Sequence, residues 1–130
     1  MVIKMLTRPR PPSSGPALLA GFDLRSQAAQ ICRRIGHGPQ LLPADGELTG
    51  HENPRVSARV YLVLRVERER RVGEALELMD LTDVRDSLVR EYLAAVIRRR
   101  EIARSTLHSP AVIFLDEPAE GLDPIARHAI

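Results

Sequence analysis

Aromatic residues are scarce in this sequence, and tryptophan is absent. Two phenylalanines and two tyrosines occur among 130 residues, so a folded core must be built from leucine, valine, isoleucine and alanine. Cys32 is the only cysteine, which excludes an internal disulfide and is typical of a reducing cytoplasm. No apolar run approaches the length of about 18 residues that a membrane span needs, and the N-terminus lacks the apolar stretch of a signal peptide. We therefore expect a cytoplasmic protein without direct membrane insertion.

Lysine is also scarce, and this excludes one class of site. Lys4 is the only lysine among 19 basic residues, and Ile3 precedes it, so the sequence holds no Gly-Lys-Ser/Thr phosphate-binding loop. The formal net charge of +2 is too small to indicate a nucleic-acid partner. The arginine-dense stretch 65–71 is interleaved with glutamates and lacks aromatics, which favours a solvated helix face over a nucleic-acid or lipid-headgroup site.

The most informative stretch is an apolar run that ends in two carboxylates. Residues 111–115 are Ala-Val-Ile-Phe-Leu, and Asp116, Glu117 and Pro118 follow directly. A short run of this composition predicts a strand buried on both faces, as in a parallel sheet, with its carboxylates at the ligand-binding edge. Because adjacent carboxylates repel, they indicate a hydrated Mg²⁺ held by the first and a water activated by the second. The alternative is a core strand that ends in a charged turn.

The Gly-Leu-Asp-Pro motif at 121–124 favours the metal site over a charged turn. Together with the strand and its carboxylates, it resembles the Walker B strand and D-loop of ABC-type ATPases. The resemblance implies an α/β fold, namely a truncated RecA-like P-loop NTPase core with an inserted helical subdomain. It also implies ATP and Mg²⁺ as cofactors, with Asp116 as a metal ligand and Glu117 and Asp123 as catalytic residues.

The first forty residues are similar to the segment that follows the phosphate-binding loop in this family. We expect a strand at 17–20, a helix that Ser26 caps and that runs to residue 34, and a strand at 35–39. Within the family, the order of the strands, helix and loop motifs in residues 1–40 is most similar to that of drug-efflux ATPases of the daunorubicin-resistance type. Gln40 then falls at the Q-loop, where the resemblance makes it a catalytic and metal-contacting residue that also relays movement to a membrane subunit.

The resemblance also implies a division of the chain. Core pieces are expected at 1–40 and 105–130, and the helical subdomain at 41–104. Within it, Thr49 and Glu52 predict a capping box before a helical pattern from about 55 to 79. Two apolar faces are expected on that pattern, formed by Val56, Val60, Val63 and Leu64 and by Val72, Ala75, Leu76 and Met79.

The signature loop of the family does not match. The family has Ser-Gly-Gly where this chain has Leu93, Ala94 and Ala95, which are thus degenerate cofactor-binding positions. In the family they grip the γ-phosphate of an ATP held by the opposite subunit. Leucine cannot donate a side-chain hydrogen bond, alanine methyl groups crowd a phosphate, and alanine continues a helix well. We therefore predict that the helix begins near Leu88 and covers the signature position.

Two further family features are missing from the sequence. We expect the chain to start just after the Walker A loop and to stop before the switch histidine. The residues that remain are Gln40, Asp116, Glu117 and Asp123, the metal-facing and water-facing half of a site. Phosphoryl transfer depends on positioning and charge stabilisation, so we expect weak nucleotide binding and no significant ATPase activity from this chain alone.

Two functional hypotheses follow. The first is a partial ATP-binding subunit of an ABC-type exporter, whose family function is ATP binding and hydrolysis coupled to drug or antibiotic efflux. Its expected partners are a membrane subunit and a second ATP-binding subunit, which would hold it at the inner face of the cell membrane. The alternative is a non-catalytic remnant or an interaction module that docks on an ABC transporter subunit. In both cases the missing strands predict exposed sheet edges and marginal stability.

Overall fold

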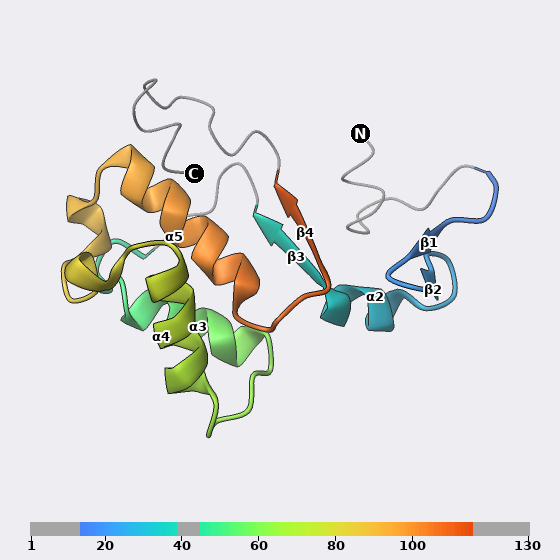
Figure 1. Ribbon diagram of the computed structural model, residues 1–130, viewed down its shortest axis with the longest axis horizontal. Helices are drawn as coiled ribbons and strands as arrows, with labels where there is room; N and C mark the ends of the chain where they lie inside the picture. The colour runs from blue at the N-terminus through green and yellow to red at the C-terminus, as the bar shows by residue number, and fades with distance from the viewer. Residues whose placement is uncertain (1–13, 39–44, 116–130) are drawn as a thin grey trace.

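The computed structural model describes residues 14–38 and 45–115, and Figure 1 shows the elements that they form. A hairpin of β1 (Leu18–Leu19) and β2 (Phe22–Asp23) precedes helix α2 (Ala28–Arg34) and strand β3 (Ile35–Gly38). Then follow helices α3 (Glu52–Val60) and α4 (Arg68–Leu78), the 3₁₀ turns η1 (Thr82–Val84) and η2 (Val89–Glu91), helix α5 (Ala94–Thr106) and strand β4 (Val112–Leu115). No helix within these described ranges is long and apolar enough to cross a membrane.

The central feature is a parallel pair of strands, β3 and β4, in the segments predicted as strands. The pair begins with Ile35 opposite Val112 and ends with Gly38 opposite Leu115. Parallel strands need a long crossover, and the helical segment 45–106 lies within it. Figure 1 shows α3, α4 and α5 on one side of the pair and α2 with the hairpin on the other.

The prediction that the last strand is buried on both faces is wrong for the described chain. Val112 and Phe114 pack against the buried side chains of Leu24, Ile31 and Ile35. Ile113 and Leu115, on the opposite face, stay 39% and 37% exposed. The physical reason is that α5 packs mainly over β3, so this face of β4 is only partly covered.

The α5–β3 contact is unusually close because it occurs at a glycine. A Cβ atom on Gly36 would lie 2.4 Å from the backbone carbonyl oxygen of Ser105 in α5. The adjoining turn is also tied to β3, since His108 Nε2 lies 2.7 Å from the carbonyl oxygen of Ile35. A carbonyl oxygen can only accept, so Nε2 carries the proton that is donated. Any side chain at position 36 would separate the helix from the strand.

The N-terminal segment differs from the prediction in its turn and its cap. The hairpin turn places Ala20 and Gly21 at φ values of 51° and 82°, so the predicted strand at 17–20 ends one residue early. Ser26 does not cap α2, which begins at Ala28 with Gln27 before it. Its hydroxyl instead donates to Asp23 Oδ1 at 2.9 Å. The Ser26 backbone N–H also donates to this oxygen, and it is the main cause that lowers the pKa of Asp23.

The capping box before α3 is confirmed. The backbone N–H of Glu52 donates to Thr49 Oγ1 at 3.1 Å, and the backbone N–H of Thr49 donates to Glu52 Oε2 at 2.9 Å. These reciprocal bonds satisfy two N–H groups at the start of the helix. The bond from the Thr49 backbone N–H to the Glu52 carboxylate is also the main cause that lowers the pKa of Glu52.

The continuous helix predicted from 55 to 79 is wrong, because the chain breaks between α3 and α4. Leu62 has a φ of 57°, in the left-handed region that a helix cannot contain. Of the first predicted apolar face, Val63 is buried, whereas Val56, Val60 and Leu64 are 48%, 74% and 66% exposed. The second face is correct, since Val72, Ala75 and Leu76 are buried and Met79 packs against them. These residues share one core with Ala58, Leu81, Ala103 and Leu107.

The prediction that the last helix begins near Leu88 is also wrong, because α5 begins at Ala94. Tertiary contacts hold the preceding residues out of the helix. Leu88 forms a β-bridge with Thr49, and the backbone N–H of Val89 donates to the carbonyl of Leu48 at 3.0 Å. The Tyr92 hydroxyl donates to the Val84 carbonyl, and burial raises the pKa of this phenol.

We expect Gly36→Ala to destabilise the fold by about 1–3 kcal/mol, because the new methyl group must push α5 away from β3. Urea denaturation followed by circular dichroism measures the change. Gly73→Ala is the matched control, since nothing lies within 4 Å of its Cβ position in α4 and the fold should gain about 0.5–1 kcal/mol. Equal effects of the two substitutions would contradict the close contact.

Gly50 and Tyr92 provide a second test, because a Cβ atom on Gly50 would lie 1.9 Å from the Tyr92 hydroxyl oxygen. Gly50→Ala should cost about 1–3 kcal/mol in the original chain and clearly less in a Tyr92→Phe background. Tyr92→Phe alone should cost about 1 kcal/mol, for the lost hydrogen bond to Val84. A double-mutant cycle in urea measures the coupling, and strictly additive effects would show that the tyrosine does not pack on Gly50.

Candidate functional site

The candidate site lies where β3 and β4 end. Gly38 and Leu115, the last described residues of the two strands, are paired in parallel register, so both strands lead to the same edge of the sheet. In sequence, Gln40 comes two residues after Gly38, and Asp116 comes directly after Leu115. Gln40, Asp116, Glu117 and Asp123 lie outside the described residues. The structure thus brings together the strands that lead to three of these predicted residues, and it does not describe the side chains.

Two contacts at the end where the pair begins hold the strands in this register. The backbone N–H of Ala111 donates to the Arg34 carbonyl at 2.7 Å, just before the pair begins. His108, whose ring lies 4.6 Å from that of Tyr61, fixes the end of α5 to Ile35. Because these contacts precede the strands, the register does not depend on the residues at the ligand-binding edge.

Leu93, Ala94 and Ala95 lie at the N-terminus of α5. Leu93 is the N-cap residue, with an extended backbone (φ −69°, ψ 156°), and its carbonyl accepts the first helical bond from the Ile97 N–H at 3.0 Å. Its side chain is 76% exposed and makes no capping hydrogen bond. The backbone N–H groups of the first helical turn are therefore uncapped by a side chain. This start is compatible with an anion, although the side chains add no donor to it.

A buried ion cluster in the middle of α5 was not anticipated from the sequence. Arg100 and Glu101 are 3% and 6% exposed and form an ion pair. Arg104 Nε lies 3.2 Å from Glu101 Oε2, close enough for an ion pair but not aligned for a hydrogen bond. Burial lowers the pKa of Arg100. The sequence contained one sign of this cluster, because Glu101 and Arg104 are three residues apart and such residues are neighbours on a helix.

The described residues contain no group of three or more His, Cys, Asp or Glu side chains that could hold a metal ion. The residues predicted to hold Mg²⁺, Asp116 and Gln40, lie outside the ranges 14–38 and 45–115. The described residues suit ATP in one respect: the start of α5 has no side-chain cap, so its backbone N–H groups can bind a phosphate. They do not suit it in another, because Leu93 offers a phosphate no hydrogen bond from its side chain.

Comparison with known proteins points to the same family as the sequence motifs. The ABC transporter family matches residues 1–120. The daunorubicin resistance ATP-binding protein DrrA2 of Streptomyces coeruleorubidus is 39% identical over 113 residues, which cover 87% of this chain and 35% of that protein. The Nod factor export ATP-binding protein I of Cupriavidus metallidurans is 33% identical over 128 residues, 98% of this chain and 42% of that protein. The chain thus spans 35–42% of the length of these curated relatives.

Solved structures agree on the fold. An ATP-binding subunit of an ABC transporter aligns with a TM-score of 0.74 and 27% identity, over 98% of this chain and 53% of that chain. A dimeric ATP-binding cassette in a post-hydrolysis state with ADP and Pi aligns with a TM-score of 0.78 over 99% of this chain and 60% of that chain. At 20% identity, the second likeness concerns the fold alone. The predicted α/β fold with a RecA-like core is confirmed, and the chain belongs to the ABC transporter family.

Proposed function

We propose that this chain is part of the ATP-binding subunit of an ABC exporter of the drug-resistance type, with impaired nucleotide binding and hydrolysis. The observation that carries the proposal is the parallel register of β3 and β4, which pairs Gly38 with Leu115. Residues that follow the carboxyl ends of neighbouring parallel strands share one edge, the edge where α/β folds bind ligands. Gln40, Asp116 and Glu117 follow these ends in sequence.

The roles proposed for these residues follow their chemistry. Asp116 and Gln40 offer the oxygen ligands that Mg²⁺ prefers, and Glu117 can accept a proton from an attacking water. Asp123 belongs to the Gly-Leu-Asp-Pro motif, which resembles the D-loop of the family, and we propose it as a catalytic residue. When bound, Mg²⁺ would neutralise charge on the phosphates of ATP. The names of the relatives, which concern daunorubicin resistance and Nod factor export, support an export role.

The proposal that ATP binding and hydrolysis are impaired depends on the residues that would contact the phosphates of ATP. The only lysine, Lys4, follows Ile3, so no P-loop lysine is available to pair with a phosphate. At the start of α5, the Leu93 side chain has no donor, and the methyl groups of Ala94 and Ala95 take space that glycine would leave open. The backbone start of the helix remains, so one weak contact to a phosphate is retained.

The assembly that we propose follows the same family pattern. Residues 1–40 and 105–130 would form core pieces and 41–104 the helical subdomain. The partners would be a membrane subunit and a second ATP-binding subunit, with the chain in the cytoplasm at the inner face of the membrane. A second candidate is a non-catalytic module that docks on an ABC transporter subunit. It is favoured by the exposed Leu93, an apolar side chain at the position of a phosphate-gripping serine.

Nucleotide binding separates the two candidates. We expect a fluorescent ATP analogue with Mg²⁺ to bind the chain with a dissociation constant of about 1 mM or weaker, because residues 1–130 contain no Gly-Lys-Ser/Thr motif to bind a phosphate. Fluorescence anisotropy measures it, with Asp116→Asn as the control for specific metal-dependent binding. Micromolar binding that Asp116→Asn abolishes would contradict the impairment. Complete absence of binding would favour the docking module.

The start of α5 can be tested directly. Leu93→Ser should stabilise the fold by about 1 kcal/mol, because the serine hydroxyl can cap the first turn and the exposed leucine gives up little packing. Thermal and urea denaturation measure the change. Leu78→Ser is the control, since Leu78 is 65% exposed but lies at the C-terminal end of α4, where serine gains no cap. A loss of stability in Leu93→Ser would show that the helix does not begin there.

A further inference from the structure

The connection between α3 and α4 has the composition of a strand, although it is folded as a turn. Residues 60–66 read Val-Tyr-Leu-Val-Leu-Arg-Val, without proline or glycine and with Arg65 as the only charged residue. Valine and tyrosine favour strands, and short apolar segments with little charge pair readily with copies of themselves. Figure 1 shows the connection protruding beyond the ends of α3 and α4, on the side away from β3 and β4. The segment is therefore placed where a second molecule can reach it.

Exposure along the connection alternates as it does along a strand. Four apolar residues at a spacing of two are 74%, 79%, 66% and 90% exposed, namely Val60, Leu62, Leu64 and Val66. Val63, in the middle, is buried. In an extended chain, residues two apart point to the same face, so the four exposed side chains would form one continuous apolar face. A row of this kind is uncommon on a soluble surface and marks a site of interaction.

The backbone of the connection is only partly committed to the turn. The N–H groups of residues 64–66 make no backbone hydrogen bond with another described residue. Those of residues 61–63 donate to carbonyls near the end of α3, at distances of 2.9 to 3.1 Å. Half of the segment thus already offers free donors to a strand, and three hydrogen bonds hold the other half.

Leu62 biases this turn toward opening. Its φ of 57° lies in the left-handed region, where a side chain with a Cβ is strained, and the exposed leucine gains little packing in return. An extended backbone removes the strain, because every L-residue can adopt the β region. Opening also takes Val63 out of the core and breaks its bonds to the Ala58 carbonyl and to Arg68 Nε, both at 2.9 Å. A single chain therefore keeps the turn, and a second chain is needed to replace these bonds.

One antiparallel register matches the apolar residues of two copies. When Val63 lies opposite Val63 of a second copy, Val60 lies opposite Val66, and Leu62 lies opposite Leu64. Each residue of the exposed apolar row then faces another apolar residue on the same side of the strand pair. Directly opposite side chains are the unit that stabilises a sheet, so this register uses the whole row.

The same register also matches the charges. It places Arg59 opposite Glu67 at both ends of the pair, and Arg65 opposite the ring of Tyr61. The antiparallel register that pairs Val60 with Leu64 would instead put Arg59 opposite Arg65. Parallel pairing in register would put each arginine opposite itself. Like charges directly opposite each other destabilise a sheet, so the charges select the register centred on Val63.

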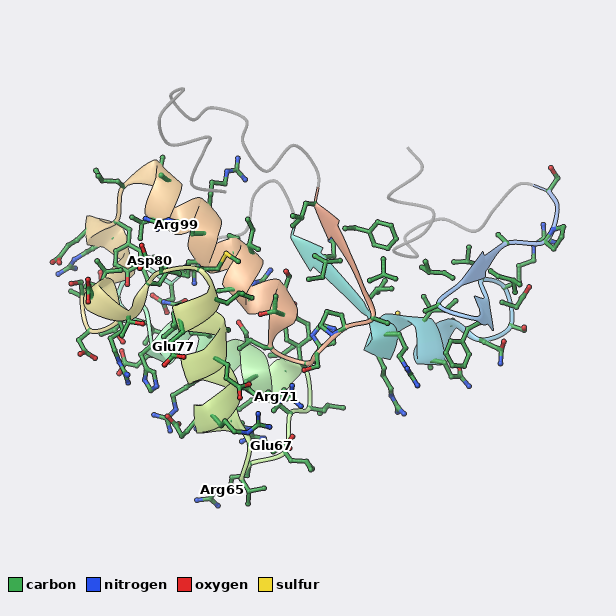
Figure 2. The ribbon with its side chains drawn as sticks, in the orientation of Figure 1. Arg65, Glu67, Arg71, Glu77, Asp80 and Arg99 are labelled. Carbon is green, nitrogen blue, oxygen red and sulfur yellow. The ribbon has the colours of Figure 1, made fainter. Side chains whose placement is uncertain are left out.

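The charged residues involved are available in the single chain. Arg59 and Arg65 form no ion pair with another described residue. Glu67 has only long contacts, at 3.4 Å to Arg70 and 3.9 Å to Arg71. In Figure 2, Arg65, Glu67 and Arg71 lie at the same end of the molecule, with Arg65 outermost.

We propose that residues 60–66 open from the turn and pair with the same segment of a second copy of this chain, as antiparallel strands centred on Val63. The partner is a second copy because the segment is complementary to itself in both apolar pattern and charge. The proposal concerns a surface remote from β3 and β4, and it is tested without nucleotide.

Charge reversal tests the partner and the register together. Arg59→Glu would face Glu67, and Glu67→Arg would face Arg59, so each variant alone should associate about tenfold more weakly than the original chain. An equimolar mixture of the two variants should regain the original association, because both end pairs then join opposite charges. Analytical ultracentrifugation of the full chain, after incubation just below its melting transition, measures the dimer.

The matched control is Arg33→Glu, at an exposed arginine in α2. It changes the net charge as much as Arg59→Glu does but lies outside the connection, so it should leave the association unchanged. Circular dichroism checks that each variant is folded.

Disulfide cross-linking measures the register directly and does not depend on the charge variants. Cys32→Ser first removes the native thiol. Leu62→Cys of one copy should then lie opposite Leu64→Cys of the other, so a mixture of the two variants should form the mixed disulfide in excess over random pairing. One variant is isotope-labelled, so that mass spectrometry distinguishes the mixed product from the two symmetric ones.

Three results would overturn the proposal. The first is a chain that stays monomeric at all concentrations after incubation just below its melting transition. The second is association of the charge-reversal variants that is as strong for each alone as for their mixture. The third is an excess of the symmetric disulfides, because parallel strands would place each cysteine opposite itself.

Discussion

The close contact between α5 and β3 is the constraint on which the rest of the described structure depends. With no side chain at Gly36, the Ser105 carbonyl can lie where a methyl group would stand. The helix then reaches the turn at His108, which binds the Ile35 carbonyl, and the chain enters β4 beside β3. The register of the two strands, and with it the shared edge before Asp116, follows from this contact. The absence of a methyl group at Gly36 thus supports the strand pair that leads to the predicted site residues.

Much of this could be predicted from local sequence, because local chemistry decides it. The strand at 112–115 follows from a short apolar run between Pro110 and Pro118, and the Thr49–Glu52 capping box follows from a spacing of three. The helix break at Leu62 could not be predicted, because leucine gives no sign of a left-handed backbone. The exposure of Ile113 could not be predicted either, since it depends on which strand α5 covers. Of the candidate site, motifs identified the family, whereas the register that joins its strands is a tertiary property.

The start of α5 shows how tertiary contacts override propensity. Ala94 and Ala95 favour helix, and nothing in residues 88–92 forbids it. Yet Leu88 pairs with Thr49, Val89 binds the Leu48 carbonyl, and Tyr92 is anchored beside Gly50, so the helix begins at Ala94. Each of these contacts forms with the segment around the start of α3. The signature position therefore keeps its place at a helix N-terminus although its characteristic side chains are gone.

The backbone frame and the chemistry of the candidate site are therefore maintained by different residues. Packing at Gly36, Tyr92 and the buried Arg100–Glu101 pair maintains the frame, and none of these residues belongs to the predicted catalytic set. The catalytic set instead depends on carboxylates, an amide and a phosphate-gripping loop. Substitutions at position 93 leave the core undisturbed, because Leu93 is largely exposed. Selection for folding alone would keep the frame, so likeness in fold identifies the family of this chain more securely than it identifies an activity.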